Sequence, residues 1–194
     1  MCTSLRLIYL RLMGVNTIVY VIKPCVDKSA NTADILKGLR LSAVVEQADI
    51  SFESTLRRLW ERTSPAGIAV SVYKGNVIVI DEGQHIDTDA IPTFTTAYPS
   101  EVLRVENSDT TDTGGFLFWR NGILVRKVSF GEKEWLDEMG ITDEEIISRF
   151  QPFTIGTAQE FEKEPVSPMN VLAAYALDYF DFYTLPWSIY TVTP

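Results

Sequence analysis

Residues 114–130 constrain the fold of this chain more than any other stretch, because two strand-forming runs flank Asn121-Gly122. Both turn residues adopt positive φ at low energetic cost, so the pair predicts a two-residue type I′ turn and a β-hairpin. Residues 116–119 are apolar at consecutive positions, whereas a strand with one solvated face alternates apolar and polar residues. We therefore expect this strand to lie inside a sheet and to be packed on both faces.

The two-residue turn also predicts which residues face each other across the hairpin. Trp119 is expected opposite Leu124, and Phe118 opposite Val125, one pair on each face of the sheet. A slip of one residue would move a whole strand's side chains to the other face, so this register decides which of them are buried.

Residues 68–81 form a second predicted hairpin of similar design. The pair Gly75-Asn76 is suited to a type II′ turn, and residues 77–80 are again apolar at consecutive positions. Two hairpins, at residues 68–81 and 115–130, thus predict a central mixed or mostly antiparallel sheet.

The remaining segments alternate irregularly between strand and helix patterns. Strands are expected at residues 17–23, 41–46, 101–106 and 185–192, and helices at residues 29–39, 51–63, 132–139, from 142 onward and at 167–183. The strand at 185–192 is expected at a sheet edge because it contains Pro186, which cannot donate a ladder hydrogen bond. This pattern predicts an α+β fold whose sheet is covered by helices, with a β-sandwich as the alternative.

Length and composition limit the organisation and the partners. A chain of 194 residues is long enough for one domain, which we place at residues 13–194, with residues 1–12 as an extension before Met13. The formal charge of −9 disfavours nucleic acid and anionic membranes and favours a protein partner with a basic surface. Two cysteines and no apolar run of about 20 residues predict a cytoplasmic protein without a transmembrane helix.

Three segments carry a family resemblance. Residues 13–17, Met-Gly-Val-Asn-Thr, precede a short apolar strand, residues 33–36 are Ala-Asp-Ile-Leu, and residues 119–126 are Trp-Arg-Asn-Gly-Ile-Leu-Val-Arg. Together with an apolar helix near the C-terminus, they resemble an uncharacterised bacterial domain family whose hairpin typically carries Asp-Gly at the turn. That family has no assigned activity, so the resemblance implies one compact domain and no chemistry.

His85 is the only histidine, and it lies in an acidic segment after the first hairpin. One imidazole and several carboxylates could bind a divalent metal if the loop folded back on itself. The alternative without a ligand is a solvated acidic turn. The candidate ligands are His85, Asp81, Glu82, Asp87 and Asp89. We favour the solvated turn, and no metal is expected.

Cys25 is the candidate reactive thiol, because it lies between a strand and a helix whose amides could stabilise a thiolate. An unreactive thiol is the favoured interpretation, since nothing in the sequence places His85 beside it. The chain has no phosphate-binding glycine loop and no dinucleotide fingerprint, so no cofactor is expected. Arg120, Arg126 and Lys127 give the second hairpin a basic edge, which we interpret as ordinary strand-edge charge.

These observations favour a non-catalytic binding protein that recognises a basic protein partner, as an immunity protein does when it neutralises a toxin. The alternative is a small enzyme or ligand-binding domain with a cleft near residues 82–112, which would gather Cys25, His85 and carboxylates. A third possibility is a self-associating structural protein, which would expose an apolar patch or an unprotected sheet edge, with residues 185–192 as the candidate.

Overall fold

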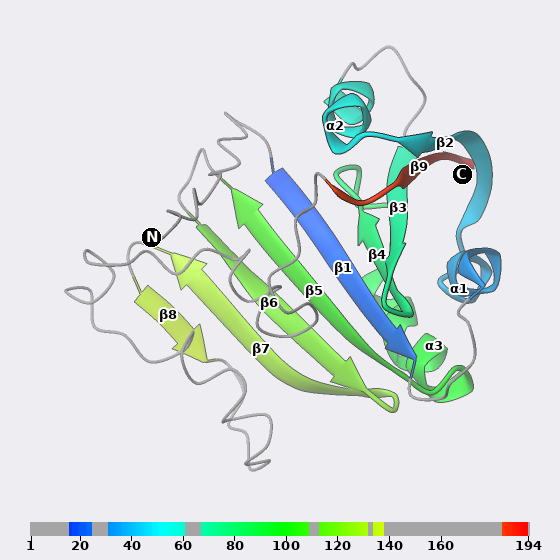
Figure 1. The fold of residues 1–194 in the computed structure, drawn as a ribbon. Coiled ribbons are helices and arrows are strands. Elements are labelled where there is room, and N and C mark those ends of the chain that lie inside the picture. The colour runs from blue at the N-terminus through cyan, green and yellow to red at the C-terminus, as the bar shows by residue number, and fades with distance from the viewer. Residues whose placement is uncertain are drawn as a thin grey trace, which may run out of the picture.

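The computed structural model describes residues 16–24, 31–60, 67–108, 113–131, 134–137 and 184–193. These residues form one nine-stranded sheet with three α-helices and a 3-10 helix (Figure 1). The strand order is β2-β9-β3-β4-β1-β5-β6-β7-β8, and every neighbouring pair is antiparallel. The prediction of a mostly antiparallel α+β arrangement is thus confirmed.

In chain order, the described residues form the following strands and helices. The strands are β1 Asn16–Pro24, β2 Ser42–Ile50, β3 Gly67–Tyr73, β4 Asn76–Ile80, β5 Ser100–Ser108, β6 Thr113–Arg120, β7 Ile123–Gly131, β8 Glu134–Asp137 and β9 Trp187–Thr193. The helices are α1 Thr32–Gly38, α2 Phe52–Trp60, the 3-10 helix η1 Thr88–Ala90 and α3 Ile91–Ala97. The strands predicted at 17–23, 41–46 and 101–106 and the helices predicted at 29–39 and 51–63 are confirmed, while the helices predicted from 142 onward and at 167–183 lie outside the described residues.

The central strands are buried on both faces, as their continuous Val and Ile runs require. All five residues of β4 are buried, and β1 beside it is buried from Ile18 to Ile22. On one face, α1 and α3 contribute Ile35, Leu36 and Phe94 to a core cluster with β1, β3 and β4. Each such buried side chain contributes roughly 1.5–3 kcal/mol to folding.

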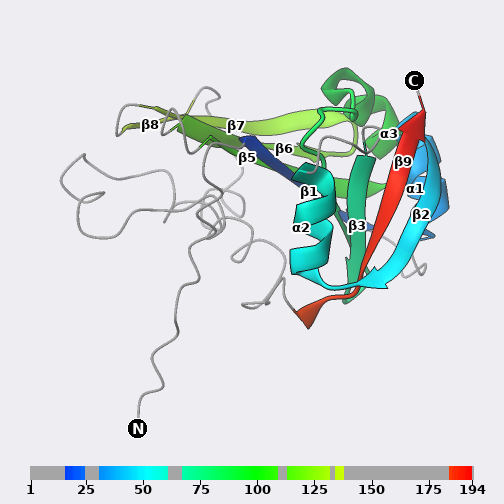
Figure 2. The same cartoon turned by 90° about the horizontal axis from the view of Figure 1, so that it is seen from above.

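Helix α2 covers the opposite face of the sheet at β3 and β9 (Figure 2). Phe52 of α2 is buried against Trp187 of β9, with 5.7 Å between the ring centroids. Ser51 caps this helix, because its hydroxyl accepts a hydrogen bond from the Ser54 backbone amide at 3.3 Å.

The turn of the second hairpin is confirmed, but its predicted register is wrong beyond the first pairs. Asn121 and Gly122 have φ values of 51° and 80°, as a type I′ turn requires. The pairing shifts by one residue between Trp119 and Phe118, so Phe118 faces Arg126 instead of Val125. The shift is a β-bulge, which inserts one extra residue and increases the local twist of the strand.

The first hairpin turns one residue earlier than predicted. Lys74 and Gly75 have φ values of 48° and 79°, and Tyr73 pairs with Asn76, so the turn is Lys74-Gly75 of type I′. The predicted Gly75-Asn76 turn is wrong because the ladder decides the position. The observed register places Val77 and Val79 in the core cluster, and this burial outweighs the roughly 1 kcal/mol that a non-glycine residue loses at positive φ.

The helix predicted at residues 132–139 is wrong, because residues Glu134–Asp137 form the strand β8. Its residues pair with β7, for example Trp135 with Phe130. A helix of about two turns has little intrinsic stability, so ladder hydrogen bonds to a neighbouring strand override the local pattern.

The C-terminal strand exists, but its predicted edge position is wrong. β9 lies between β2 and β3, and β2 is the edge strand instead. Pro186 precedes β9 and therefore removes no ladder hydrogen bond from it, and its carbonyl accepts a hydrogen bond from the Ser71 hydroxyl at 2.8 Å. Proline thus marks the start of an interior strand here.

Helix α3 was not predicted, because its sequence Ile-Pro-Thr-Phe-Thr-Thr-Ala is poor in helix formers. Tertiary contacts stabilise it: Ile91 and Phe94 are buried in the core cluster. The buried Thr95 hydroxyl accepts a hydrogen bond from the Gly122 amide at 2.9 Å, which attaches the second hairpin's turn to the helix. None of the helices in the described part is long and apolar enough to cross a membrane.

Candidate functional site

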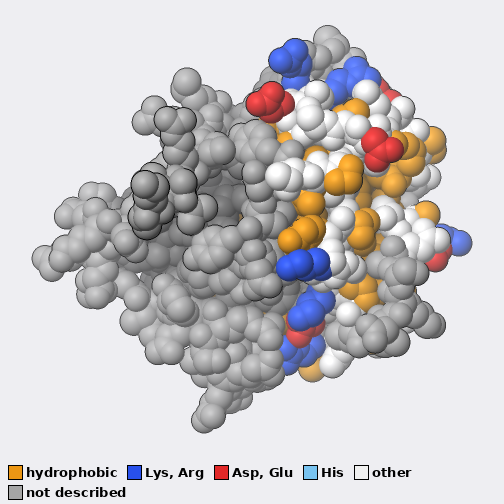
Figure 3. Space-filling view, viewed as in Figure 1, with side chains coloured by type: hydrophobic (Ala, Val, Ile, Leu, Met, Phe, Trp, Pro, Cys, Tyr) orange, Lys and Arg blue, Asp and Glu red, His pale blue; other side chains and the backbone are white. Residues whose placement is uncertain are grey.

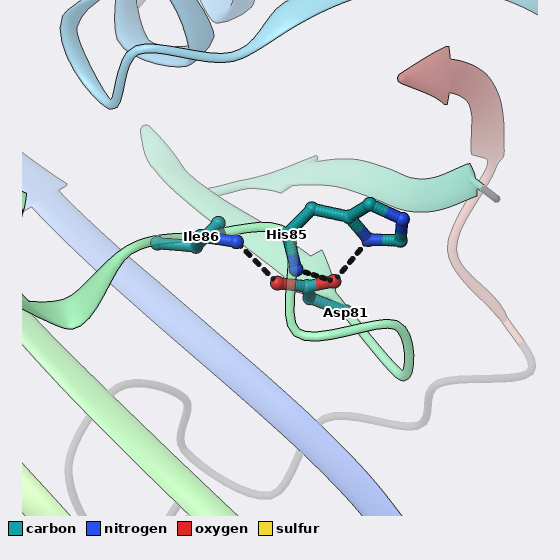
Figure 4. Close-up of polar contacts among 3 residues, drawn as sticks. All are labelled: Asp81, His85 and Ile86. Atoms are coloured by element: carbon teal, nitrogen blue, oxygen red, sulfur yellow. Dashed lines mark hydrogen bonds and ion pairs between the residues drawn. The ribbon is translucent and has the colours of Figure 1, made fainter. Parts of the chain in front are cut away.

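The segment that follows β4, residues 81–89, is the candidate site, and we call it the acidic loop. Asp81 is fully buried and lies at its base. Its Oδ1 accepts hydrogen bonds from the His85 backbone amide at 3.0 Å and from His85 Nδ1 at 2.7 Å, and its Oδ2 accepts one from the Ile86 amide at 2.8 Å (Figure 4). One carboxylate therefore holds both the loop backbone and the imidazole ring.

These contacts determine the tautomer of the histidine. An ionised carboxylate is only an acceptor, so His85 Nδ1 carries the proton and donates it to Asp81. In the neutral ring the lone pair then lies on Nε2, on the side of the ring away from Asp81 (Figure 4). A histidine oriented in this way is suited to proton transfer or to metal ligation through Nε2.

The loop is shaped around this ring. A Cβ atom at Gly83 would lie 2.0 Å from His85 Cε1, so only glycine leaves room for the imidazole. The next residue, Gln84, has a φ of 55°, which is uncommon for a residue other than glycine. Such local strain persists only where the surroundings hold it, and the three hydrogen bonds to Asp81 do so here.

A second polar group lies beneath the loop on neighbouring strands. Tyr20 of β1 pairs with Arg104 of β5 in the sheet, and Arg104 forms an ion pair of 2.7 Å with Glu106. Burial raises the pKa of Tyr20 to about 12, although the Arg104 guanidinium, which hydrogen-bonds to it, opposes this increase. The negative charge of Asp81 also raises this pKa, so Asp81 acts electrostatically on Tyr20.

The candidate metal ligands point in different directions. Asp81 is turned inward, while Asp87 is exposed and caps η1 by accepting a hydrogen bond from the Asp89 amide at 3.0 Å. Within the described ranges, no three His, Cys, Asp or Glu residues are grouped so that they could hold a metal ion. The favoured interpretation, a solvated acidic turn, describes Asp87 and Asp89 but misses the buried role of Asp81.

Other predicted site residues lie apart from the loop. Cys25 lies outside the described residues, so its predicted relation to His85 stays a prediction. Arg120 is paired with Glu101 at 2.6 Å on the sheet, and Arg126 is buried against the Phe116 ring at 6.0 Å. Two of the three residues of the predicted basic edge, Arg120 and Arg126, thus make contacts within the sheet.

The other notable surface is the edge strand β2. Val44 and Val45 are 67% and 50% exposed, which is unusual for neighbouring valines in a strand. Sequence reasoning missed this edge because it assigned the edge to residues 185–192. The sequence did contain an indication of an exposed edge. Residues 42–50 include two consecutive valines and contain neither lysine nor proline.

The described surface seen in Figure 3 carries charges of both signs, with hydrophobic side chains between them. Acidic residues are therefore not concentrated on that face.

No family model, no curated protein and no solved structure matches this chain.

Proposed function

We propose that this protein is a binding protein that recognises a protein partner with a basic surface, and that the acidic loop is its contact. The observation that supports this most is the anchoring of the loop: Asp81, fully buried, holds the loop from below, while Asp87 and Asp89 remain exposed. The exposed carboxylates are thus presented on a backbone that is ordered before the partner arrives.

This order matters for affinity. A mobile loop loses conformational entropy when it binds, at roughly 0.5–1.5 kcal/mol for each immobilised side chain, and a pre-organised loop avoids part of that loss. The three hydrogen bonds to Asp81 and the cap at Asp87 fix the loop in the unbound protein. Carboxylates held in this way match a fixed pattern of Lys and Arg on a partner.

The overall charge supports the same proposal. At −9, the chain attracts cationic surfaces over distances of about one Debye length, roughly 8–10 Å at physiological salt. Such attraction mainly accelerates encounter, whereas the fixed carboxylates select the partner. An inhibitor of a basic toxin, comparable to an immunity protein, is one form that this function takes.

The test is a tagged pull-down from the native host at low salt and again at high salt, with mass spectrometry of the retained proteins. The test variant combines Asp87→Asn and Asp89→Asn, because an asparagine side chain at the cap position still accepts the hydrogen bond that caps η1. The matched control combines Asp34→Asn and Glu53→Gln, which remove the same charge from exposed positions on α1 and α2.

We expect a stoichiometric basic protein that is lost at high salt, and at least a tenfold weaker retention by the loop variant than by the control. Equal losses in both variants would show that net charge alone drives capture. The proposal fails if no basic protein is retained at either salt concentration.

The alternative, an enzyme or ligand-binding domain near residues 82–112, has one specific observation in its favour. His85 Nδ1 is held by a buried carboxylate, which is the arrangement of a general base that acts through Nε2. The substitution His85→Gln separates the two proposals: it removes the base but leaves Asp87 and Asp89 exposed. Partner capture that survives this change favours binding, whereas a turnover that it abolishes favours an enzyme.

A further inference from the structure

We infer that a second copy of this chain pairs with the edge of β2, so that two sheets join across a two-fold axis at Val44. The inference is independent of the proposed partner at the acidic loop. β9 and β3 lie between β2 and β4, and the acidic loop follows β4, so the two surfaces are separate.

The outer edge of β2 is open in the described part of the chain. β2 ends the strand order and pairs only with β9 there, and Figure 2 shows it as the outermost strand at its end of the sheet. Val44 and Val45 are at least half exposed. As consecutive residues of a strand, they lie on opposite faces of the sheet, where they pair with Thr191 and Tyr190 respectively. An open edge with exposed valines is a template for another strand.

Proteins usually protect such an edge with lysine, proline or a bulge. β2 contains neither lysine nor proline, and its register shifts occur after Val45, between Val45 and Gln47 and again before Ile50. The regular ladder with β9 therefore covers Ser42 to Val45. This segment is regularly paired on its inner side and can accept a partner strand on its outer side, whereas register shifts interrupt the pairing of the rest of β2.

The sequence of this segment is complementary to itself. Two antiparallel strands related by a two-fold axis perpendicular to the sheet keep the same face, so each residue must pair with one on its own face. An axis at Val44 places Val44 opposite Val44 of the second copy, and Ala43 opposite Val45. All three positions are apolar, and such apolar pairs contribute roughly 0.2–1 kcal/mol each beyond Ala–Ala.

Charge favours this occupant as well. Residues 42–45 carry no charge, and Glu46 is neutralised by Arg58 of α2 at 2.5 Å. The register places Glu46 near Ser42 of the second copy, away from the other Glu46, so no like charges meet across the strands. A basic strand from another protein would find no uncompensated acid along Ser42 to Glu46, which makes it the weaker occupant.

The primary test is the oligomeric state by sedimentation equilibrium over a range of protein concentrations. We expect a concentration-dependent rise to twice the monomer mass. The substitution Val44→Lys should restore the monomer mass, because it places two ammonium groups opposite each other at the axis. The control is Val72→Lys, since Val72 is 46% exposed but lies on β3, which has a neighbour on each side.

The register is tested by cross-linking in a background that carries Cys2→Ser and Cys25→Ser. Residues that face each other in an antiparallel pair have Cα atoms about 4.5–5.5 Å apart, within the range of a disulfide. Val44→Cys should therefore form a disulfide-linked dimer on mild oxidation, whereas Ser42→Cys, whose counterpart is Glu46, should not.

A dimer with efficient Ser42→Cys and no Val44→Cys cross-linking would overturn the register. A monomer at every concentration would overturn the inference. If the monomeric wild type instead captured a different protein, and Val44→Lys abolished that capture, the occupant of the edge would be that protein and not a second copy. Because none of these variants alters the acidic loop, their outcome is independent of the pull-down.

Discussion

The acidic loop and the β2 edge differ in how the fold supports them. The loop is held from below by Asp81, which is fully buried and accepts three hydrogen bonds. The β2 edge has exposed valines and no partner strand in the described residues on its outer side. One surface is thus completed within the chain, while the other offers unused strand-pairing capacity.

This difference predicts how each surface should respond to substitution. Changes in the loop anchor remove buried hydrogen bonds, so they lower the stability of the monomer. Changes at the exposed valines remove nothing from the core, so they alter assembly and leave the monomer's stability nearly unchanged. The free energy of unfolding of variants tests this contrast. The substituted positions lie in the two surfaces and at Tyr20 beneath the loop.

The substitution Asp81→Ala should lower the free energy of unfolding by about 3–5 kcal/mol, because it leaves buried amide and imidazole donors without their acceptor. Urea denaturation measures the loss. Asp89→Ala is the control in the same loop, since the Asp89 side chain is exposed, and it should change stability by less than about 0.5 kcal/mol. Equal effects of the two substitutions would show that Asp81 does not anchor the loop.

The ionisation of Tyr20 should lower the free energy of unfolding in strong alkali. Its pKa is about 12 in the folded protein and 10.0 in the unfolded chain, so between these pH values the unfolded state releases a proton that the native state retains. Stability is therefore complete below pH 10 and falls as pH rises toward 12, by roughly 2–3 kcal/mol.

Urea denaturation of wild type and Tyr20→Phe between pH 9 and pH 12 measures this effect, because phenylalanine does not titrate. The difference in stability between the two proteins should shift in favour of the variant as pH rises. Parallel curves would contradict the assignment of the raised pKa to Tyr20.

Gly83→Ala should lower the free energy of unfolding by about 1–2 kcal/mol, because the new methyl group displaces the His85 ring from Asp81. A double-mutant cycle with His85→Ala checks the cause. Once the ring is absent, Gly83→Ala should cost less than about 0.5 kcal/mol. A loss that is the same in both backgrounds would mean that the backbone, and not the ring, requires glycine.

Val44→Lys should change the free energy of unfolding of the monomer by less than about 0.5 kcal/mol. Val44 is 67% exposed, so its removal from water contributes little to folding. Denaturation at low protein concentration, where a dimer dissociates, gives this value. A large loss would show that β2 is part of the monomer's structural core, and the contrast with the acidic loop would disappear.

Local chemistry explains which features were predictable. The Asn121-Gly122 turn and the buried run of β4 depend on the preferences of neighbouring residues, and both are confirmed. The acidic loop was also identified from its composition. The division of the loop into a buried anchor, Asp81, and an exposed carboxylate, Asp87, was not predicted. The two residues are of the same type and differ only in their surroundings.

Sequence alone therefore determined the described strands other than β8, the turn of the second hairpin and the residues of the candidate loop, since periodicity and turn chemistry act over a few residues. Only the tertiary structure decided the bulge opposite Phe118, the strand state of Glu134–Asp137, the interior position of β9 and the exposure of β2. Each of these depends on pairing between distant segments, whose hydrogen bonds and burial outweigh local preference by several kcal/mol.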